Sequence, residues 1–257
     1  MITAGIDVGS LTTEALVYDS ERGILGYSIV LTGGSSHEAA LSAFEHALKF
    51  SGLERDAIEG IVATGCGRGI VEFAPRKVTE ITCLAKGASF LFPESRTVID
   101  IGGQDTKVIR VDERGRVLEF EMNDKCAAGT GRFLEVMARA LGVELDKMGE
   151  RSLKAKKDLT ISSVCTVFAE SEVISLVSQG EEVEEILRAV HKAIAKRTAG
   201  LLERIGGAVP KVVMTGGVAK NIGVVKALED ELGMSLIIYS EPQIVCALGA
   251  ALLAQEG

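Results

Sequence analysis

The sequence predicts an α/β fold made of two structurally related lobes. Strand-like and helix-like apolar segments are mixed along the whole chain, which is the pattern of an α/β protein. The motif Ile6-Asp-Val-Gly-Ser10 returns as Ile99-Asp-Ile-Gly-Gly-Gln-Asp105, and each copy leads into two further strands. Such self-similarity indicates two related lobes that face each other across a cleft. With 257 residues and only four prolines, we expect lobes at residues 1–95 and 96–257 that are joined by helices rather than by a flexible tether.

The N-terminal lobe begins with a mostly apolar strand that ends in the first Asp-x-Gly motif. A second strand follows within a few residues, so glycine and hydroxyl residues lie at the turn of a hairpin. Ser36 is the candidate N-cap of the first helix. The expected elements are strands at Ile2–Val8, Glu14–Tyr18, Ile24–Leu31 and Gly60–Thr64, and helices at Ser36–Ser51 and Thr79–Phe90.

The C-terminal lobe repeats this order and adds helices. Its last helix is a candidate to pack back on the N-terminal lobe. The expected strands are Thr106–Val111, Arg116–Glu121, Lys211–Met214 and Ser235–Tyr239, and the expected helices are Thr130–Leu141, Thr166–Gln179, Glu181–Ile205, one after Asn221, and Ile244–Gln255.

Composition excludes several classes of protein. A formal net charge of −8 argues against a nucleic-acid binder. No apolar run approaches the roughly 20 residues of a membrane span, and Met1 leads straight into a strand, so we expect no membrane association and a cytoplasmic location. Five cysteines without paired short spacing predict neither a disulfide framework nor a CxxC zinc knuckle. We expect Cys83 and Cys246 to be buried structural thiols.

The two Asp-x-Gly motifs have the features of a phosphate clamp. A nucleotide triphosphate needs backbone N–H donors at close range and carboxylates that hold Mg²⁺. Asp7 and Asp100 end apolar strands, where a carboxylate has little structural reason to be, and the glycines lack a Cβ that would keep phosphate away. Ordinary hairpin turns are the alternative. The expected donors are Gly9, Ser10, Leu11, Thr12, Gly102 and Gly103, with Thr13 as a further hydroxyl.

Gln104 and Asp105 follow the second motif, at the place where a γ-phosphate would lie. Phosphoryl transfer to water depends mainly on positioning and electrostatics. We therefore expect either Gln104, or Asp100 with Asp105, to orient the attacking water, and Asp7 to belong to the same catalytic set.

A third glycine segment lies later in the chain. The sequence predicts a strand, a double glycine and then a helix at Thr215-Gly-Gly-Val-Ala-Lys-Asn221. It lacks the third spaced glycine of a dinucleotide fingerprint. The double glycine would instead let an adenine or a ribose lie against the backbone. The residues expected here are Gly216, Gly217, Val218 and Asn221, with Gln243 as a further nucleotide contact.

Two cysteines stand at predicted helix starts. Cys126 lies among small residues before the Thr130 helix, and Cys165 directly precedes the Thr166 helix. A helix N-terminus favours thiolate. A [4Fe–4S] cluster usually needs four thiolates, which a C₂ dimer would supply. Spacing alone leaves two alternatives open, namely buried structural thiols and zinc at the same dimer site.

Several segments together resemble a known family across residues 2 to 255. They are Gly5-Ile-Asp-Val-Gly-Ser10, Ala63-Thr-Gly-x-Gly-Arg68, Val98-Ile-Asp-Ile-Gly-Gly-Gln-Asp105, Met122-Asn-Asp-Lys-Cys-Ala-Ala-Gly-Thr-Gly-Arg-Phe133, Val164-Cys-Thr-Val-Phe-Ala-Glu-Ser-Glu172 and Val213-Met-Thr-Gly-Gly-Val-Ala219. The turns resemble those of the actin, hexokinase and heat-shock ATPase superfamily of ribonuclease-H-like folds. The chain as a whole resembles activators of 2-hydroxyacyl-CoA dehydratases, which are grouped with ATPase subunits of benzoyl-CoA reductases. Cys66 stands where we would expect a tyrosine or another non-ligand.

The resemblance implies an ATP hydrolase of anaerobic metabolism that transfers single electrons. It implies ATP, Mg²⁺ and one [4Fe–4S] cluster per homodimer, held by Cys126 and Cys165 of both subunits. Reduced ferredoxin or flavodoxin would be the donor, and an iron–sulfur dehydratase the acceptor. Cleft closure around ATP would change the angle between the helices that carry the two cysteines. A benzoyl-CoA reductase or a double-cubane protein as acceptor, a metabolite kinase, and a metal-free nucleotide-switched binding module are the alternatives.

Overall fold

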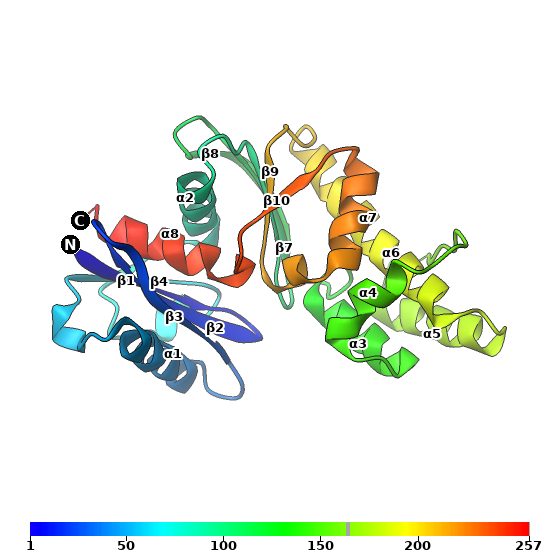
Figure 1. Cartoon of the computed structure of the whole chain (residues 1–257), viewed down its shortest axis with the longest axis horizontal. Helices are drawn as coiled ribbons and strands as arrows, with labels where there is room; N and C mark the ends of the chain where they lie inside the picture. The colour runs from blue at the N-terminus through cyan, green and yellow to red at the C-terminus, as the bar shows by residue number, and fades with distance from the viewer. Residues whose placement is uncertain (163–164, 257) are drawn as a thin grey trace. The chain divides into compact units, whose positions relative to one another are not determined.

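The computed structural model describes residues 1–162 and 165–256, so Ser163 and Val164, which belong to the predicted Cys165 motif, lie outside it. The described residues form two five-stranded sheets with helices (Figure 1), which confirms the predicted α/β class. The chain forms two compact units. The first is Met1–Val98, Ile109–Glu119 and Tyr239–Gly257, and the second is Ile99–Val108 and Phe120–Ile238.

The first sheet has the order β3-β2-β1-β4-β5, with antiparallel β1/β2 and β2/β3 pairs and parallel β1/β4 and β4/β5 pairs. Its strands are β1 (Ile2–Val8), β2 (Thr12–Asp19), β3 (Gly23–Leu31), β4 (Gly60–Thr64) and β5 (Arg76–Lys77). The helices of this unit are α1 (Ser36–Ser51), α2 (Glu80–Leu91) and α8 (Val245–Ala254).

Strand β1 is buried on both faces. Ala4, Ile6 and Val8 share a core with α1, whereas Gly5 faces the backbone of α8. A Cβ at Gly5 would lie 1.9 Å from the Ala247 carbonyl oxygen, so only glycine allows this approach. The central strand is therefore fixed between α1 and α8 (Figure 1), and its carboxyl end carries the first Asp-x-Gly motif.

The second sheet has the order β10-β9-β6-β7-β8. Its strands are β6 (Thr97–Ile101), β7 (Thr106–Val111), β8 (Val117–Asn123), β9 (Val212–Thr215) and β10 (Leu236–Ile238). The helices of this part of the chain are α3 (Gly131–Leu141), α4 (Met148–Ser152), α5 (Thr166–Ser178), α6 (Val183–Arg204) and α7 (Ile222–Leu232). A core of apolar side chains from β6, β9 and these five helices holds the second unit together.

One predicted capping residue was wrong, and two short elements were not predicted. Ser35, not Ser36, caps α1, because its side chain accepts a hydrogen bond from the Glu38 N–H. The short α4 and β5 gave no periodic signal and were missed. In the part of the chain that the structure describes, no helix combines the length and apolarity needed to cross a bilayer.

Candidate functional site

The first Asp-x-Gly turn closes on itself in the first unit. The Gly9 N–H donates to the Thr12 carbonyl at 3.0 Å, and a Cβ at Gly9 would lie 2.7 Å from that oxygen. Asp7 is buried at the end of β1, while Ser10 is exposed and Leu11 is half-buried. The turn therefore presents backbone and hydroxyl groups beside a buried carboxylate.

The structure brings Gln243 to this turn. Its side-chain amide lies 3.4 Å from the Thr12 hydroxyl and 3.4 Å from a Glu14 carboxylate oxygen. Gln243 is thus placed with Thr12, although the two residues lie far apart in the sequence. Its expected contact with nucleotide remains a prediction.

The second turn is built around three charged side chains. Lys107 donates to Asp105 at 2.9 Å and lies 3.5 Å from Asp100. The Thr215 hydroxyl donates to Asp100 at 2.8 Å, and the Gly102 N–H closes the turn on the Asp105 carbonyl at 3.0 Å. Gln104 is exposed. The predicted Asp100 and Asp105 therefore lie together.

Lys107 was missed by the sequence reasoning. Its position in an apolar alternation indicated only a strand, and nothing local marks it as the partner of two carboxylates. Burial raises the pKa of Asp100; the Lys107 and Thr215 interactions oppose this rise, whereas the Asp105 charge adds to it. The cluster offers carboxylate oxygens of the kind that a hydrated divalent cation takes as ligands.

The glycine turn after β9 lies against the end of β6. Gly216 has φ +84, and a Cβ there would lie 2.4 Å from the Ile101 carbonyl oxygen and 3.1 Å from Asp100 Oδ1. Gly217 and Val218 begin the short turn η4 (Gly217–Lys220) that follows. The predicted phosphate and adenosine motifs of the second unit are therefore direct neighbours.

Asn221 has a structural function. Its Oδ1 accepts hydrogen bonds from the N–H groups of Gly223 and Val224 at 3.0 and 3.2 Å and so caps α7. Its Nδ2 lies 3.4 Å from His191 Nε2. The amide of Asn221 is thus engaged inside the protein, and its expected nucleotide contact stays a prediction.

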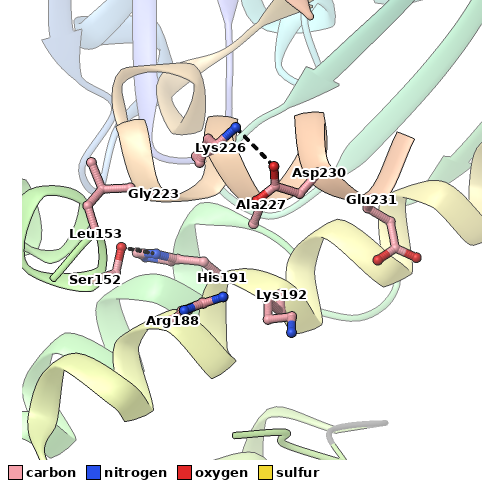
Figure 2. A pocket seen from close by; sticks show the side chains of 10 residues that line it. All are labelled: Ser152, Leu153, Arg188, His191, Lys192, Gly223, Lys226, Ala227, Asp230 and Glu231. Atoms are coloured by element: carbon pink, nitrogen blue, oxygen red, sulfur yellow. Dashed lines mark hydrogen bonds and ion pairs between the residues drawn. The ribbon is translucent and has the colours of Figure 1, made fainter. Parts of the chain in front are cut away.

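A cavity of about 490 Å³ lies between α4, α6 and α7 (Figure 2). His191 is 1% exposed, and its Nδ1 lies 2.9 Å from Ser152 Oγ, which donates to the Gly149 carbonyl at 2.7 Å. Because Asn221 Nδ2 is a donor, His191 Nε2 accepts and Nδ1 carries the proton. Desolvation lowers the pKa of His191 to about 3. The sequence alone does not predict this buried site, because helix periodicity does not show which face of α6 the neighbouring helices cover.

Cys126 lies in a closed turn between β8 and α3. The Asn123 side chain donates to the Cys126 carbonyl at 2.8 Å, and the Thr130 hydroxyl donates to the Ala127 carbonyl at 2.6 Å. Cys126 itself is half-buried. The small residues expected around it are thus part of a compact, hydrogen-bonded turn.

Cys165 is the N-cap residue of α5 and is also half-buried. Helix α5 packs against α3, so the two cysteines precede helices that contact each other. Val167 and Phe168, in the first turn of α5, are exposed, Phe168 by 73%. Among the described residues no group of three or more histidine, cysteine or acidic side chains is arranged to hold a metal. Two thiols supply half of a four-thiolate set.

The other cysteines differ in environment. Cys83 and Cys246 are buried, as predicted, and burial raises the pKa of the Cys83 thiol to about 12. Cys66 is exposed, and its Sγ lies 3.5 Å from the Val8 carbonyl oxygen.

Residues 4–254 match the model of the BadF/BadG/BcrA/BcrD ATPase family. The activator of lactoyl-CoA dehydratase from Anaerotignum propionicum is 49% identical over 100% of this chain and 98% of its own length. One of the subunits of benzoyl-CoA reductase from Thauera aromatica is 34% identical over 98% of this chain and 92% of its own length.

Solved structures agree with these matches. Component A of the (R)-2-hydroxyglutaryl-CoA dehydratase of Acidaminococcus fermentans is 44% identical, with a TM-score of 0.96 over 100% of this chain and 98% of that one. The activator of the 2-hydroxyisocaproyl-CoA dehydratase of Clostridium difficile, with bound ADPNP, is 42% identical, with a TM-score of 0.94 over 100% and 95%. A ROK-family glucokinase from Streptomyces griseus, 15% identical with a TM-score of 0.64 over 100% of both chains, shares the fold alone. The likeness confirms the predicted superfamily fold.

Proposed function

Because this chain belongs to the BadF/BadG/BcrA/BcrD ATPase family, we propose that it is an ATP-dependent one-electron reductase that activates an iron–sulfur 2-hydroxyacyl-CoA dehydratase. One observation of the structure carries the proposal. The same unit contains the buried Asp100 with the half-buried Asp105 at a glycine turn, and two half-buried cysteines before helices that contact each other. The carboxylate cluster suits nucleotide chemistry, and the two cysteines suit a shared metal centre.

The nucleotide is assigned to the glycine turns. Mg²⁺ would neutralise phosphate charge when bound, and the carboxylate oxygens of Asp100 and Asp105 are ligands of the kind that such a cation takes. Gln104, or Asp100 with Asp105, orients the attacking water, and Asp7 completes the catalytic set. The binding residues assigned are Gly9, Ser10, Leu11, Thr12, Gly102, Gly103, Gly216, Gly217, Val218, Asn221 and Gln243.

Cys126 and Cys165 are assigned to a [4Fe–4S] cluster that two copies of the chain share. Such a cluster supplies one-electron chemistry when it is bound. Each chain offers two half-buried thiols, so a C₂ homodimer completes four ligands. The exposed Val167 and Phe168 beside Cys165 support a protein surface that covers this region in the assembly.

The reaction moves one electron and hydrolyses ATP to ADP and phosphate. A reduced ferredoxin or flavodoxin is the proposed donor, and a dehydratase that acts on a 2-hydroxyacyl-CoA is the proposed acceptor. The 49% identity to a dehydratase activator favours this acceptor over the benzoyl-CoA reductase indicated by the 34% match.

Anaerobic purification tests the cluster. We expect a coloured homodimer with four irons per two chains, and loss of iron in the Cys126→Ala, Cys165→Ala double variant. Cys66→Ala is the matched control, because Cys66 is exposed and is not assigned as a ligand. A colourless protein without stoichiometric iron would refute the cluster, and full iron in the double variant would refute the ligand assignment.

The nucleotide assignment has a separate test. Asp7→Asn and Asp100→Asn each remove one carboxylate with little change in shape, so ATP turnover should fall greatly. Unchanged turnover in both variants contradicts the clamp. Transfer of phosphate to a metabolite instead of water would indicate a kinase.

A further inference from the structure

The second Asp-x-Gly turn is hydrogen-bonded directly to the segment that carries Cys126. The Gly131 N–H donates to the Gly102 carbonyl at 2.9 Å, and the Arg132 N–H donates to the Gly103 carbonyl at 2.8 Å. The Thr106 hydroxyl donates to the Gly129 carbonyl at 3.0 Å. Three bonds therefore connect residues 102–106 with residues 129–132.

Thr106 makes the side-chain bond of this connection. It is the first residue of β7, it directly follows Asp105, and it is 2% exposed. A buried hydroxyl bond of this kind is well shielded from water. Asp105 is therefore the direct neighbour in sequence of the residue that contacts Gly129, so a shift of the Asp105 backbone acts directly on Thr106.

Gly129 has little freedom to move away from Thr106. It has φ +89, and a Cβ there would lie 2.8 Å from Cδ of Arg197 on α6. The residue is buried between the hydroxyl on one side and the Arg197 side chain on another. A displacement of Thr106 is therefore passed to the turn rather than absorbed by empty space.

The turn that leads back to Cys126 is short and closed. The Asn123 side chain donates a hydrogen bond to the Cys126 carbonyl, and the Thr130 hydroxyl donates one to the Ala127 carbonyl. Only three residues separate Cys126 from Thr130 in the sequence. Movement of Gly129 should consequently change the position of Cys126.

We infer that Thr106 is a positioning residue that couples the nucleotide-binding turn to the cysteine segment. The inference rests on the proposed nucleotide site at residues 100–105 and does not require the cluster. Occupation of the turn by nucleotide shifts Thr106, and the Thr106 hydroxyl transmits the shift to residues 123–133.

Hydrogen–deuterium exchange on the full chain tests this coupling, with and without the Mg²⁺ complex of the ATP analogue ADPNP. In the wild-type protein, ADPNP should change exchange in peptides that cover residues 99–106 and also in those that cover residues 123–133. Thr106→Val, which replaces the hydroxyl by a methyl group, should keep the first change and lose most of the second. Thr106→Ser keeps the hydroxyl and should restore both. A purely structural role would alter exchange in Thr106→Val equally with and without nucleotide.

The outcomes separate the coupling from the proposed function. If ADPNP changes residues 99–106 but not residues 123–133 in the wild-type protein, or if Thr106→Val retains the full change at residues 123–133, the coupling is refuted and the nucleotide site stands. If ADPNP leaves residues 99–106 unchanged, the nucleotide site is refuted and the coupling falls with it. Should Thr106→Val not fold, Thr106→Ala takes its place, and the wild-type comparison alone can still refute the coupling.

Discussion

Replacing His191 by glutamine should change the way in which the stability of this protein depends on pH. His191 is 1% exposed and hydrogen-bonded through both ring nitrogens, to Ser152 and to Asn221. Glutamine removes the titrating imidazole, and its side-chain oxygen can still accept the bond from Asn221. The variant therefore tests the ionisation of His191 separately from its contact with Asn221, the N-cap of α7.

The magnitude follows from the two pKa values. Desolvation lowers the pKa of His191 from 6.5 to about 3, and the charged side chains around its cavity are Arg188, Lys192, Lys226, Asp230 and Glu231. A folded-state pKa below the unfolded value means that the unfolded chain binds more protons. The stabilisation is therefore fully present above pH 6.5 and is lost as pH falls toward 3. Between pH 7.5 and pH 5 the loss should be about 2 kcal/mol.

Urea unfolding followed by far-ultraviolet circular dichroism measures this effect, because the chain has no tryptophan for fluorescence. The stability difference between the wild-type protein and His191→Gln should shrink by about 2 kcal/mol from pH 7.5 to pH 5. His46→Gln is the matched control, because His46 is exposed, and it should leave the wild-type pH dependence in place. A difference between wild type and His191→Gln that stays constant over this range would show that His191 does not remain neutral in the fold.

Three further predictions follow from the second unit. Lys107→Met leaves the buried Asp100 and the half-buried Asp105 without their shared ammonium, so the unfolding free energy should fall by about 3–5 kcal/mol. A loss below about 1 kcal/mol in urea titrations would contradict the ion-pair geometry. Gly129→Ala should destabilise more than Gly142→Ala, because both glycines have positive φ but a Cβ meets Arg197 at the first and, among the described residues, open space at the second; equal midpoints in thermal melts would contradict this. Chelation of iron should abolish electron transfer while ATP binding, measured by calorimetry, persists; loss of both would show that the metal also maintains the nucleotide turns.

The sequence predicted those features that depend on local pattern. The strands Ile2–Val8 and Gly60–Thr64 were predicted with the bounds that the structure gives them. An apolar run bounded by turn residues indicates a strand even when the neighbouring strand is not known. Positions that depend on packing were not predictable. His191 finds its buried site only when segments distant in sequence meet. Lys107 meets Asp100 and Asp105 through the turn between β6 and β7, and the sequence spacing does not show the geometry of that turn. Asn221 caps α7, a function that the sequence reasoning did not predict, and its nucleotide contact stays a prediction.

The start of α3 explains why the cysteine turn lies beside the second Asp-x-Gly turn. The first N–H groups of a helix lack intrahelical acceptors and must find them elsewhere. In α3 the N–H groups of Gly131 and Arg132 find the carbonyls of Gly102 and Gly103, and a Cβ at Gly131 would lie 3.2 Å from the Gly102 oxygen. The carbonyls of two glycines in the second Asp-x-Gly turn thus cap the helix that follows Cys126. Rotation of either peptide group toward a phosphate would weaken its bond to the start of α3 at residues 131 and 132, whereas the Thr106 hydroxyl acts on Gly129, which is nearer to Cys126 in the sequence.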